Sequence, residues 1–330
     1  MPRSVDVVIV THNRYELTDS CLRHLRAQTI EHRVIVVDNG STDGTPERLL
    51  GDWPGVQLES LDRNHGFAVA SNRGVTCGSG ETVVLLNNDV KCRADFLERL
   101  IAPLCNSVVG SVASLMLQPG EELIDSLGLA ADVTLAGFPR LHGLPARCAC
   151  DPRPVLAGPA GTAAAYRRAA WEQVGGLDET IFTYMEDFDL ALRLRSAGWE
   201  SVAAPGAVGV HLGSATHGHR SAWQRRNGGF GRGYLLRRYG LPRGAARARA
   251  LVTEAVVVVG DLLISHDLAA LQGRVRGWSA GQCRPHLPRP PAAAIDRQIG
   301  FRDSLALRRG VYARRDGSGS GVGLQTPREG

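Results

Sequence analysis

The first part of the chain alternates short apolar runs with segments in which apolar residues recur at helical spacing. An unbroken apolar run is typical of a strand buried in a parallel sheet, and recurrence at every third or fourth position is typical of an amphipathic helix. The predicted strands are residues 5–10, 34–37, 56–61 and 82–86, and the predicted helices are residues 15–28, a segment opened by Pro46, and residues 67–76. This alternation with short connections predicts an α/β fold with a doubly wound, mostly parallel central sheet and helices on both faces.

Beyond the fourth strand the pattern is less regular, and it changes again near residue 220. Arginine-rich helical stretches, a proline-rich segment and a Gly/Ser-rich tail then replace the alternation. We therefore predict an α/β domain over residues 1–220, a mainly helical extension over 221–316 and a disordered tail over 317–330. The elements predicted between these limits are a loop entering a helix over residues 160–173, a helix over 183–195 and a strand over 201–210.

Residues 255–264 are the longest candidate for a membrane-spanning segment, but the run is short and Asp261 interrupts it. We interpret it as a buried helix or strand. The N-terminus passes from Met1 directly into a strand pattern with no apolar leader, which predicts a cytoplasmic protein. The seven cysteines, an odd number scattered through the chain, predict reduced thiols. The spacing of Cys148 and Cys150 matches neither a redox motif nor the usual zinc ligands.

The chain carries a formal net charge of +5, and many of its arginines lie beyond residue 219. Such a surface suits an anionic partner, either a phosphate-bearing acceptor or the inner face of the cell membrane, but it also fits a solvated helical surface. The basic segment lacks the interleaved aromatic residues and motifs of nucleic-acid-binding proteins, so we predict no nucleic-acid partner. The extension over 221–316 is expected to contact the acceptor or a second copy in a homodimer.

Polar side chains follow the fourth predicted strand at once. Asn87, Asn88 and Asp89 stand at its end, and open α/β sheets bind ligands at the carboxyl ends of their strands. Mg²⁺ or Mn²⁺ takes oxygen ligands and usually holds only one or two carboxylates beside water and substrate phosphate. The tip therefore fits a metal and diphosphate site, although Asn and Asp also favour turns and helix caps.

A second acidic site lies in the helix predicted over 183–195. Asp187 shares a face with Leu190, Ala191 and Leu194, so its carboxylate is expected to point inward. A carboxylate in the first turn gains from the helix dipole, while apolar neighbours push its pKa upward, a balance that suits a general base. An acidic cluster that caps the helix is the structural alternative. His211, just after the strand predicted over 201–210, fits either a structural role or a metal ligand.

Seven motifs in a fixed order carry a resemblance to a known family. They are VIVTHNR (8–14), VVDNGSTDG (36–44), NHGFAVASNRG (64–74), LLNND (85–89), GPAGTA (158–163), GGLDE (175–179) and YMEDFDL (184–190). Over about residues 4–220 the chain resembles the family 2 glycosyltransferases, which have the GT-A fold, and especially their bacterial rhamnosyltransferase-like branch.

The resemblance implies roles for named residues on the donor side. The nucleotide would be held by the loop after the first strand and the acid that ends the second, and the donor pocket would include a glycine turn and the helix after it. The tip matches the family's Asp-x-Asp motif, except that Asn87 stands in the first position and leaves Asp89 as the principal metal ligand. The implied donor-binding residues are Thr11, Asn13, Arg14, Asp38, Asn64, Gly66, Asn72, Asn87 and Asn88, and the implied ligands of Mg²⁺ or Mn²⁺ are Asp89 and His211.

The resemblance also implies an inverting transfer of a sugar from a nucleoside-diphosphate donor to a hydroxyl acceptor. Glu186 and Asp187 match the family's catalytic acid pair, with Asp187 as the general base. The branch favours dTDP-rhamnose as donor and UDP-hexoses next. Cell-envelope glycans, lipid-linked glycans and natural products are the acceptors it implies.

Two other interpretations compete. Asp38 at the end of the second strand resembles the ribose-binding acid of a nicotinamide-dependent oxidoreductase, but residues 11–14 contain no glycine, and that fold needs a glycine-rich first turn. A nucleotide-sugar-binding module without turnover gains support from Asn87, because one metal-binding carboxylate is missing. The presence of Asp89, Asp187 and His211 favours the enzyme.

Overall fold

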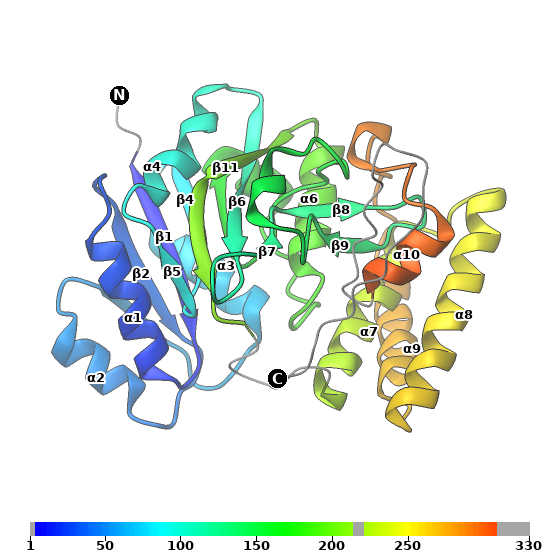
Figure 1. Cartoon of the computed structure of the whole chain (residues 1–330). Helices are drawn as coiled ribbons and strands as arrows, with labels where there is room; N and C mark the ends of the chain where they lie inside the picture. The colour runs from blue at the N-terminus through cyan, green and yellow to red at the C-terminus, as the bar shows by residue number, and fades with distance from the viewer. Residues whose placement is uncertain (1–3, 214–220, 309–330) are drawn as a thin grey trace.

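The computed structural model describes residues 4–213 and 221–308 (Figure 1). Within these residues the main sheet has the strand order β3-β2-β1-β4-β10-β6-β11-β5, with β7 paired to β6. Its strands are β1 (Val5–Thr11), β2 (Arg33–Asp38), β3 (Gln57–Ser60), β4 (Thr82–Asn87), β5 (Val90–Cys92), β6 (Val109–Leu117), β7 (Ile124–Ser126), β10 (Ala163–Arg167) and β11 (Glu200–His211). A separate hairpin pairs β8 (Leu129–Ala131) with β9 (Gly137–Pro139).

The sheet is parallel in one half and mixed in the other. β3, β2, β1 and β4 are parallel neighbours, as predicted. Beyond β4 the sheet is mixed: β11 is parallel to β6, whereas β10 runs antiparallel to both β4 and β6, and β5 runs antiparallel to β11. β10 itself was predicted as part of a loop. Its sequence, Ala-Ala-Ala-Tyr-Arg, has few of the β-branched and aromatic residues that mark strands.

Helices cover both faces of the sheet, which confirms that part of the prediction. Side chains alternate along β4, so that Val84 and Leu86 join one apolar cluster while Val83 and Leu85 join the other. The first cluster includes residues of α1 (Tyr15–Arg26), α2 (Thr45–Asp52) and α4 (Phe96–Ile101), and the second includes residues of α3 (Phe67–Cys77), α5 (Arg168–Val174) and α6 (Glu186–Ser196). Short 3₁₀ helices lie at Ala102–Cys105, Ala146–Cys150 and Ala292–Ala294.

The C-terminal region is helical, as predicted. It contains α7 (Ala222–Arg238), α8 (Ala245–Ser265), α9 (Ala269–Gln282) and α10 (Phe301–Arg308). Figure 1 shows α7 and α9 side by side, with α8 on the outer side of the molecule. The predicted tail over 317–330 lies outside the described residues, and the domain limits stay a prediction.

The interpretation of residues 255–264 as a buried element is wrong. They form the C-terminal half of α8, but Leu263 and Ile264 are 68% and 70% exposed. In the described part of the chain, no helix combines the length and apolar character needed to cross a membrane.

Candidate active site

The tip of β4 meets the end of β11 because of the strand register. β5 follows the tip directly and pairs antiparallel with β11, which sets His211 opposite Val90. The Nε2 atom of His211 therefore lies 3.4 Å from Oδ2 of Asp89. The other carboxylate oxygen of Asp89, Oδ1, is buried and has no hydrogen-bond partner among the described residues. The structure thus brings together the two predicted metal ligands, although they are far apart in the sequence.

Asp125 on β7 orients His211 from the other side. Its Oδ2 atom lies 2.9 Å from Nδ1 of His211. Burial alone would lower the pKa of His211, but the hydrogen bonds and charges of Asp125 and Asp89 raise it to about 10. Sequence reasoning missed Asp125, because it lies in the irregular middle of the chain, where no spacing connects it to a histidine eighty-six positions later.

The residues at the tip fit a hard divalent cation. An unpartnered, buried carboxylate oxygen on Asp89 and an imidazole nitrogen on His211 would supply two protein ligands. No group of three or more histidine, cysteine, aspartate or glutamate residues suited to a metal occurs within residues 4–213 and 221–308. Such a site would depend on phosphate or water for its remaining ligands, which is usual for Mg²⁺. The metal-ligand role stays a prediction.

The loops after β1 and β2 are bonded to each other. Asn13 and Arg14 have left-handed backbones, with φ of 60° and 63°. The N–H of Asn13 donates to Ser41 Oγ at 2.6 Å, and the N–H of Arg14 donates to Asp43 Oδ2 at 2.9 Å. These bonds hold an irregular backbone beside the end of β2, where local strain is typical of functional sites.

Asp38 is the last residue of β2, and only one of its two carboxylate oxygens accepts a hydrogen bond within the described residues. Its side chain is almost fully buried, and Oδ2 accepts a hydrogen bond from the N–H of Ser41 at 3.2 Å. Oδ1 has no partner within the described residues. Burying an unpaired carboxylate oxygen is costly, so this atom is an acceptor suited to an N–H or O–H group of a ligand.

The predicted donor residues Thr11 and Asn88 are hydrogen-bonded to each other. The amide of Asn88 donates to the hydroxyls of Thr11 and Thr18, each at 3.2 Å. The Thr11 hydroxyl also donates to the carbonyl of Asn13 at 3.1 Å. These contacts tie the β4 tip to the first loop. No side-chain hydrogen bond of Asn87 is found among the described residues, whereas its backbone N–H donates to the Thr162 carbonyl at 2.9 Å.

The turn at Asn64 and Gly66 packs against the loop before α6. Gly66 has φ of +89°, and a Cβ there would lie 2.4 Å from the carbonyl oxygen of Phe182. Asn64 Oδ1 accepts hydrogen bonds from Gly66 N–H and from the amide of Asn39. Sequence reasoning gave no role to Asn39, whose side chain also reaches the Gly66 carbonyl. A glycine is therefore required by both the turn and the close approach.

Asn72 lies farther along α3 and has its amide engaged in a turn. Its Nδ2 donates to the carbonyl of Leu177 and to Glu179, and its Oδ1 accepts from the N–H of Leu177 at 2.9 Å. These contacts hold the turn over 175–179. They support a positioning role, and direct donor contact by Asn72 stays a prediction.

Glu186 and Asp187 occupy the first turn of α6, which begins three residues later than predicted. Tyr184 and Met185 adopt left-handed backbones with φ of 66° and 79°, so the helix cannot start before them. Asp187 Oδ2 accepts from the N–H of Gly161 at 2.8 Å, and Oδ1 accepts from the N–H of Phe188 at 2.7 Å. Glu186 is buried, and its Oε2 has no partner among the described residues.

The surroundings of Glu186 and Asp187 act differently on the pKa values of their carboxyl groups. Burial raises the pKa of both carboxyl groups, and the charge of Asp187 helps to raise that of Glu186 to about 8. The backbone N–H groups of Gly161 and Phe188 oppose the rise at Asp187 because they favour its charged form. Glu186 is therefore the acid that keeps a proton near neutral pH, and Asp187 is the one suited to accept one.

Two consecutive hydrogen bonds connect Asp187 to the β4 tip. Asn87 N–H bonds to the carbonyl of Thr162, and the preceding residue, Gly161, donates to Asp187. The pairing of Ala163 with Leu86 holds this segment against β4. Both predicted acidic sites thus lie at one edge of the sheet.

Solved structures with a similar fold define the fold class of the chain. A mannosyltransferase from Pyrobaculum calidifontis, solved with GDP-Man and Mn²⁺, is 21% identical with a TM-score of 0.54 over 93% of this chain and 81% of that one. GalNAc-T7, solved with UDP, GalNAc and Mn²⁺, is 13% identical with a TM-score of 0.57 over 86% of this chain and 55% of that one. The fold is the predicted GT-A type.

Family models identify the chain more closely. Residues 6–175 match the model described as Glycosyl transferase family 2, and residues 142–260 match Glycosyl transferase family group 2. The chain therefore belongs to the family 2 glycosyltransferases, as its motifs predicted. The N-acetylglucosaminyl-diphospho-decaprenol L-rhamnosyltransferase of Mycobacterium tuberculosis is 33% identical over 202 residues, which cover 54% of this chain and 66% of that relative.

Proposed function

We propose that the chain is an inverting glycosyltransferase that transfers a sugar from a nucleoside-diphosphate donor to a hydroxyl acceptor. The observation that carries the proposal is the position of Asp187. Its carboxylate is held by the N–H of Gly161, one residue from the Thr162 carbonyl that binds the β4 tip. A base beside a diphosphate site is the arrangement that direct displacement requires.

Asp187 would act as the general base. As the acceptor oxygen forms its bond to the anomeric carbon, the bond from that carbon to the diphosphate oxygen breaks. The hydroxyl proton passes to Asp187, and the electron pair of the broken bond leaves with the diphosphate. The N–H groups of Gly161 and Phe188 hold the carboxylate in one orientation and leave each oxygen a free lone pair. Glu186 beside it would stay protonated and so avoid a second negative charge.

The donor would bind along the ends of β1, β2 and β4. The unpartnered Oδ1 of Asp38 would accept a hydrogen bond from the base or ribose. Asp89 and His211 would hold Mg²⁺ or Mn²⁺, which would supply positive charge against the departing diphosphate. Asn13 and Arg14 would shape the nucleotide end.

We assign dTDP-rhamnose as the first candidate donor and UDP-hexoses as the second. The similarity to the mycobacterial N-acetylglucosaminyl-diphospho-decaprenol L-rhamnosyltransferase supports this choice. The diphospho-decaprenol in that relative's name supports a lipid-linked acceptor. We propose that such an acceptor belongs to the cell envelope and is met at the inner face of the cell membrane. Natural-product acceptors are the alternative.

A donor panel tests the proposal. Thermal unfolding is followed with dTDP-rhamnose, UDP-hexoses, GDP-mannose and NAD, each with and without Mn²⁺, and positive sugars are then assayed for release of the nucleoside diphosphate. A bound donor at a hundred times its Kd stabilises by about 2.7 kcal/mol. We expect this gain to require Mn²⁺ and to be lost in Asp89→Ala. Asp151→Ala, which removes an exposed carboxylate, is the matched control and should keep it.

Two results would contradict the proposal. Stabilisation by NAD alone would favour an oxidoreductase. Binding of a nucleotide sugar with no diphosphate release over a range of acceptors would favour a binding module without turnover, the interpretation that Asn87 leaves open.

A further inference from the structure

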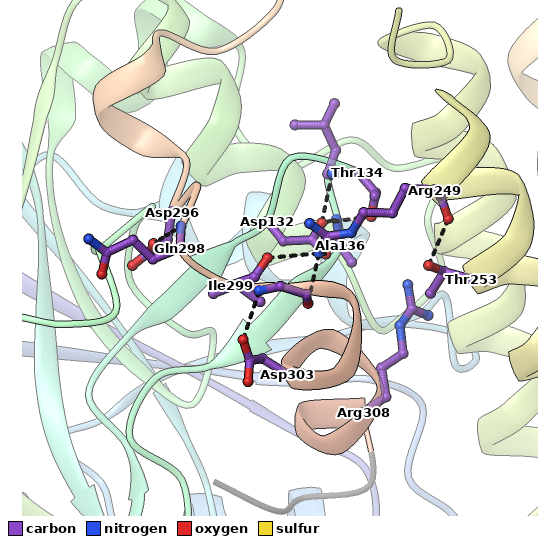
Figure 2. Close-up of polar contacts among 12 residues, drawn as sticks. Asp132, Thr134, Ala136, Arg249, Thr253, Asp296, Gln298, Ile299, Asp303 and Arg308 are labelled. Atoms are coloured by element: carbon purple, nitrogen blue, oxygen red, sulfur yellow. Dashed lines mark hydrogen bonds and ion pairs between the residues drawn. The ribbon is translucent and has the colours of Figure 1, made fainter. Parts of the chain in front are cut away.

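Helix α8 turns its charged side toward the protein. Figure 2 shows Arg249 of α8 directed toward Asp132 and the backbone near Ile299. Its Nη2 atom donates to Asp132 Oδ2 at 3.0 Å, to the carbonyl of Ile299 at 2.8 Å and to that of Gly300 at 3.0 Å. Asp132 is fully buried. This ion pair and the two backbone hydrogen bonds therefore hold the first half of α8 against the rest of the protein.

Glu254, five residues farther along α8, is also directed toward the protein. Its carboxylate pairs with Arg232 at 2.8 Å, Arg274 at 3.0 Å and Arg308 at 3.1 Å, so that α7, α9 and α10 all meet it. Rotation of α8 away from these arginines would be costly, because it would leave buried charges without partners. These ion pairs fix which side of α8 faces outward.

The outward side of α8 is aliphatic. Every exposed residue between 251 and 264 has an aliphatic side chain. Val252, Val256, Val259 and Leu263 recur at a spacing that keeps them on one face, with exposed fractions of 52%, 42%, 53% and 68%. Together with Leu271 and Val275 of α9, which are also exposed, we name these residues the aliphatic face. A helix with charges inside and aliphatic residues outside is the reverse of one that faces water.

The exposed charges around the aliphatic face are positive. From residue 243 to 289 the exposed charged residues are Arg243, Arg247, Arg276, Arg284 and Arg289, while Asp261 and Asp267 are half-buried and Asp267 pairs with Arg225. A cavity of about 410 Å³ opens near the start of α8, and its lining includes Arg237, Arg243, Arg247 and His286 but no carboxylate. None of these three arginines pairs with an acid among the described residues. The cavity suits a phosphate group.

We infer that the aliphatic face and its arginines dock on an anionic phospholipid membrane surface. The aliphatic side chains would enter the boundary of the acyl region, and Arg243 and Arg247 would bind lipid phosphates. A second copy of the chain fits less well, because a two-fold contact would bring two arginine-rich borders together. Binding to the surface does not require that a helix cross it.

Contacts through α7 connect this surface to the candidate active site. α7 packs along α9, and its Trp223 contacts Phe182 and Tyr184, with ring centroids 6.3 Å and 6.0 Å apart. Both residues belong to the loop before Asp187. Docking would therefore hold the acid pair near lipid-linked acceptors, and in this respect the inference rests on the proposed function.

Vesicle co-sedimentation of the full chain tests the inference. We expect the protein to sediment with vesicles of phosphatidylglycerol and phosphatidylcholine, and to remain in solution with phosphatidylcholine alone or at high salt. The double variant Val256→Glu with Leu263→Glu should lose binding. The double variant Arg243→Ala with Arg247→Ala should bind about fivefold more weakly for each arginine removed. Leu50→Glu, at an exposed aliphatic position on α2, should bind like the wild type.

Equal sedimentation with both kinds of vesicle, or none with either, would overturn the inference. A dimer in sedimentation velocity that Val256→Glu with Leu263→Glu dissociates, without vesicle binding, would assign the face to a second copy. Vesicle binding requires no turnover, so its failure is separate from failure of the proposed transfer. Circular dichroism and thermal unfolding of each variant without any donor show whether its fold is intact.

Discussion

At the scale of single residues, Glu186 and Asp187 show how two adjacent carboxyl groups are given different surroundings, which act differently on their pKa values. Both carboxyl groups are held in the first turn of α6, and burial raises the pKa of both. Only Asp187 receives two backbone N–H bonds, from Gly161 and Phe188. These two N–H groups, one from a neighbouring loop and one from α6 itself, favour the charged form of Asp187 and oppose the effect of burial.

The raised pKa of Glu186 predicts a pH-dependent stability. In the folded chain it is about 8, against an ordinary value of 4.5, so between these values the folded protein keeps a proton that the unfolded chain releases. The free energy of unfolding should therefore fall as the pH rises from 5 to 8, by at most about 1.4 kcal/mol per pH unit from this group. Glu186→Gln removes this dependence.

Urea unfolding of the wild type and Glu186→Gln at several pH values measures the difference. The variant should become progressively more stable relative to the wild type as the pH rises. Glu172→Gln, at an exposed glutamate on α5, should follow the wild type. Parallel pH profiles for the wild type and Glu186→Gln would refute a raised pKa at Glu186.

Three of the acidic residues that the sequence predicted at the site stand at the ends of regular elements. Asp38 and Asp89 follow apolar strands, and Asp187 opens a helix, so periodicity alone places them at element ends. The sequence did not indicate Asp125 or Asn39, because each contacts residues that are distant in the sequence and are brought close only by the tertiary fold. A short strand beside β6 gives Asp125 its contact with His211.

At the scale of elements, α7 and α9 approach each other through glycines. A Cβ at Gly277 would lie 2.0 Å from the carbonyl of Phe230, and one at Gly233 would lie 2.0 Å from that of Arg274. Glycine lowers helix propensity, so the sequence of these two segments favours a helix only weakly. In the structure it allows two backbones to meet closely.

Gly277→Ala should therefore destabilise the chain, although alanine is the better helix former. The added methyl group has no space, and overpacking of this kind costs about 1–3 kcal/mol. Gly260→Ala is the matched control, because nothing lies within 4 Å of its added Cβ; it should be neutral or stabilising by up to about 1 kcal/mol. Chemical denaturation measures both. Equal effects of the two substitutions would contradict the close contact.

The elements that were predicted correctly are those whose own residues carry the signal. β1, β2 and β4 are mainly apolar runs, and the ends of each lie within one residue of the predicted limits. β10 is alanine-rich, and it becomes a strand only because β4 and β6 lie on either side of it. The two antiparallel pairs that β10 makes follow from this insertion, which local pattern cannot indicate.

At the scale of the whole molecule, the chain joins a GT-A fold to a helical region whose outer surface is aliphatic and basic. The sequence suggested the basic surface, but it placed residues 255–264 in the interior because of their hydrophobicity. The structure differs because Arg249 and Glu254 pair with buried residues and therefore occupy the inward side of α8, which leaves the aliphatic residues on the outward side. Which side of a helix faces inward was decided by charge pairs far apart in the sequence.

The central claim is that Asp187 and the β4 tip act on the same sugar nucleotide. The most direct test measures donor affinity and the single-turnover transfer rate of Asp187→Asn with Mn²⁺ and the donor found by the panel. We predict that the Kd for the donor stays close to that of the wild type, while the rate falls by about 10²-fold or more. Transfer by Asp187→Asn at the wild-type rate would contradict the claim.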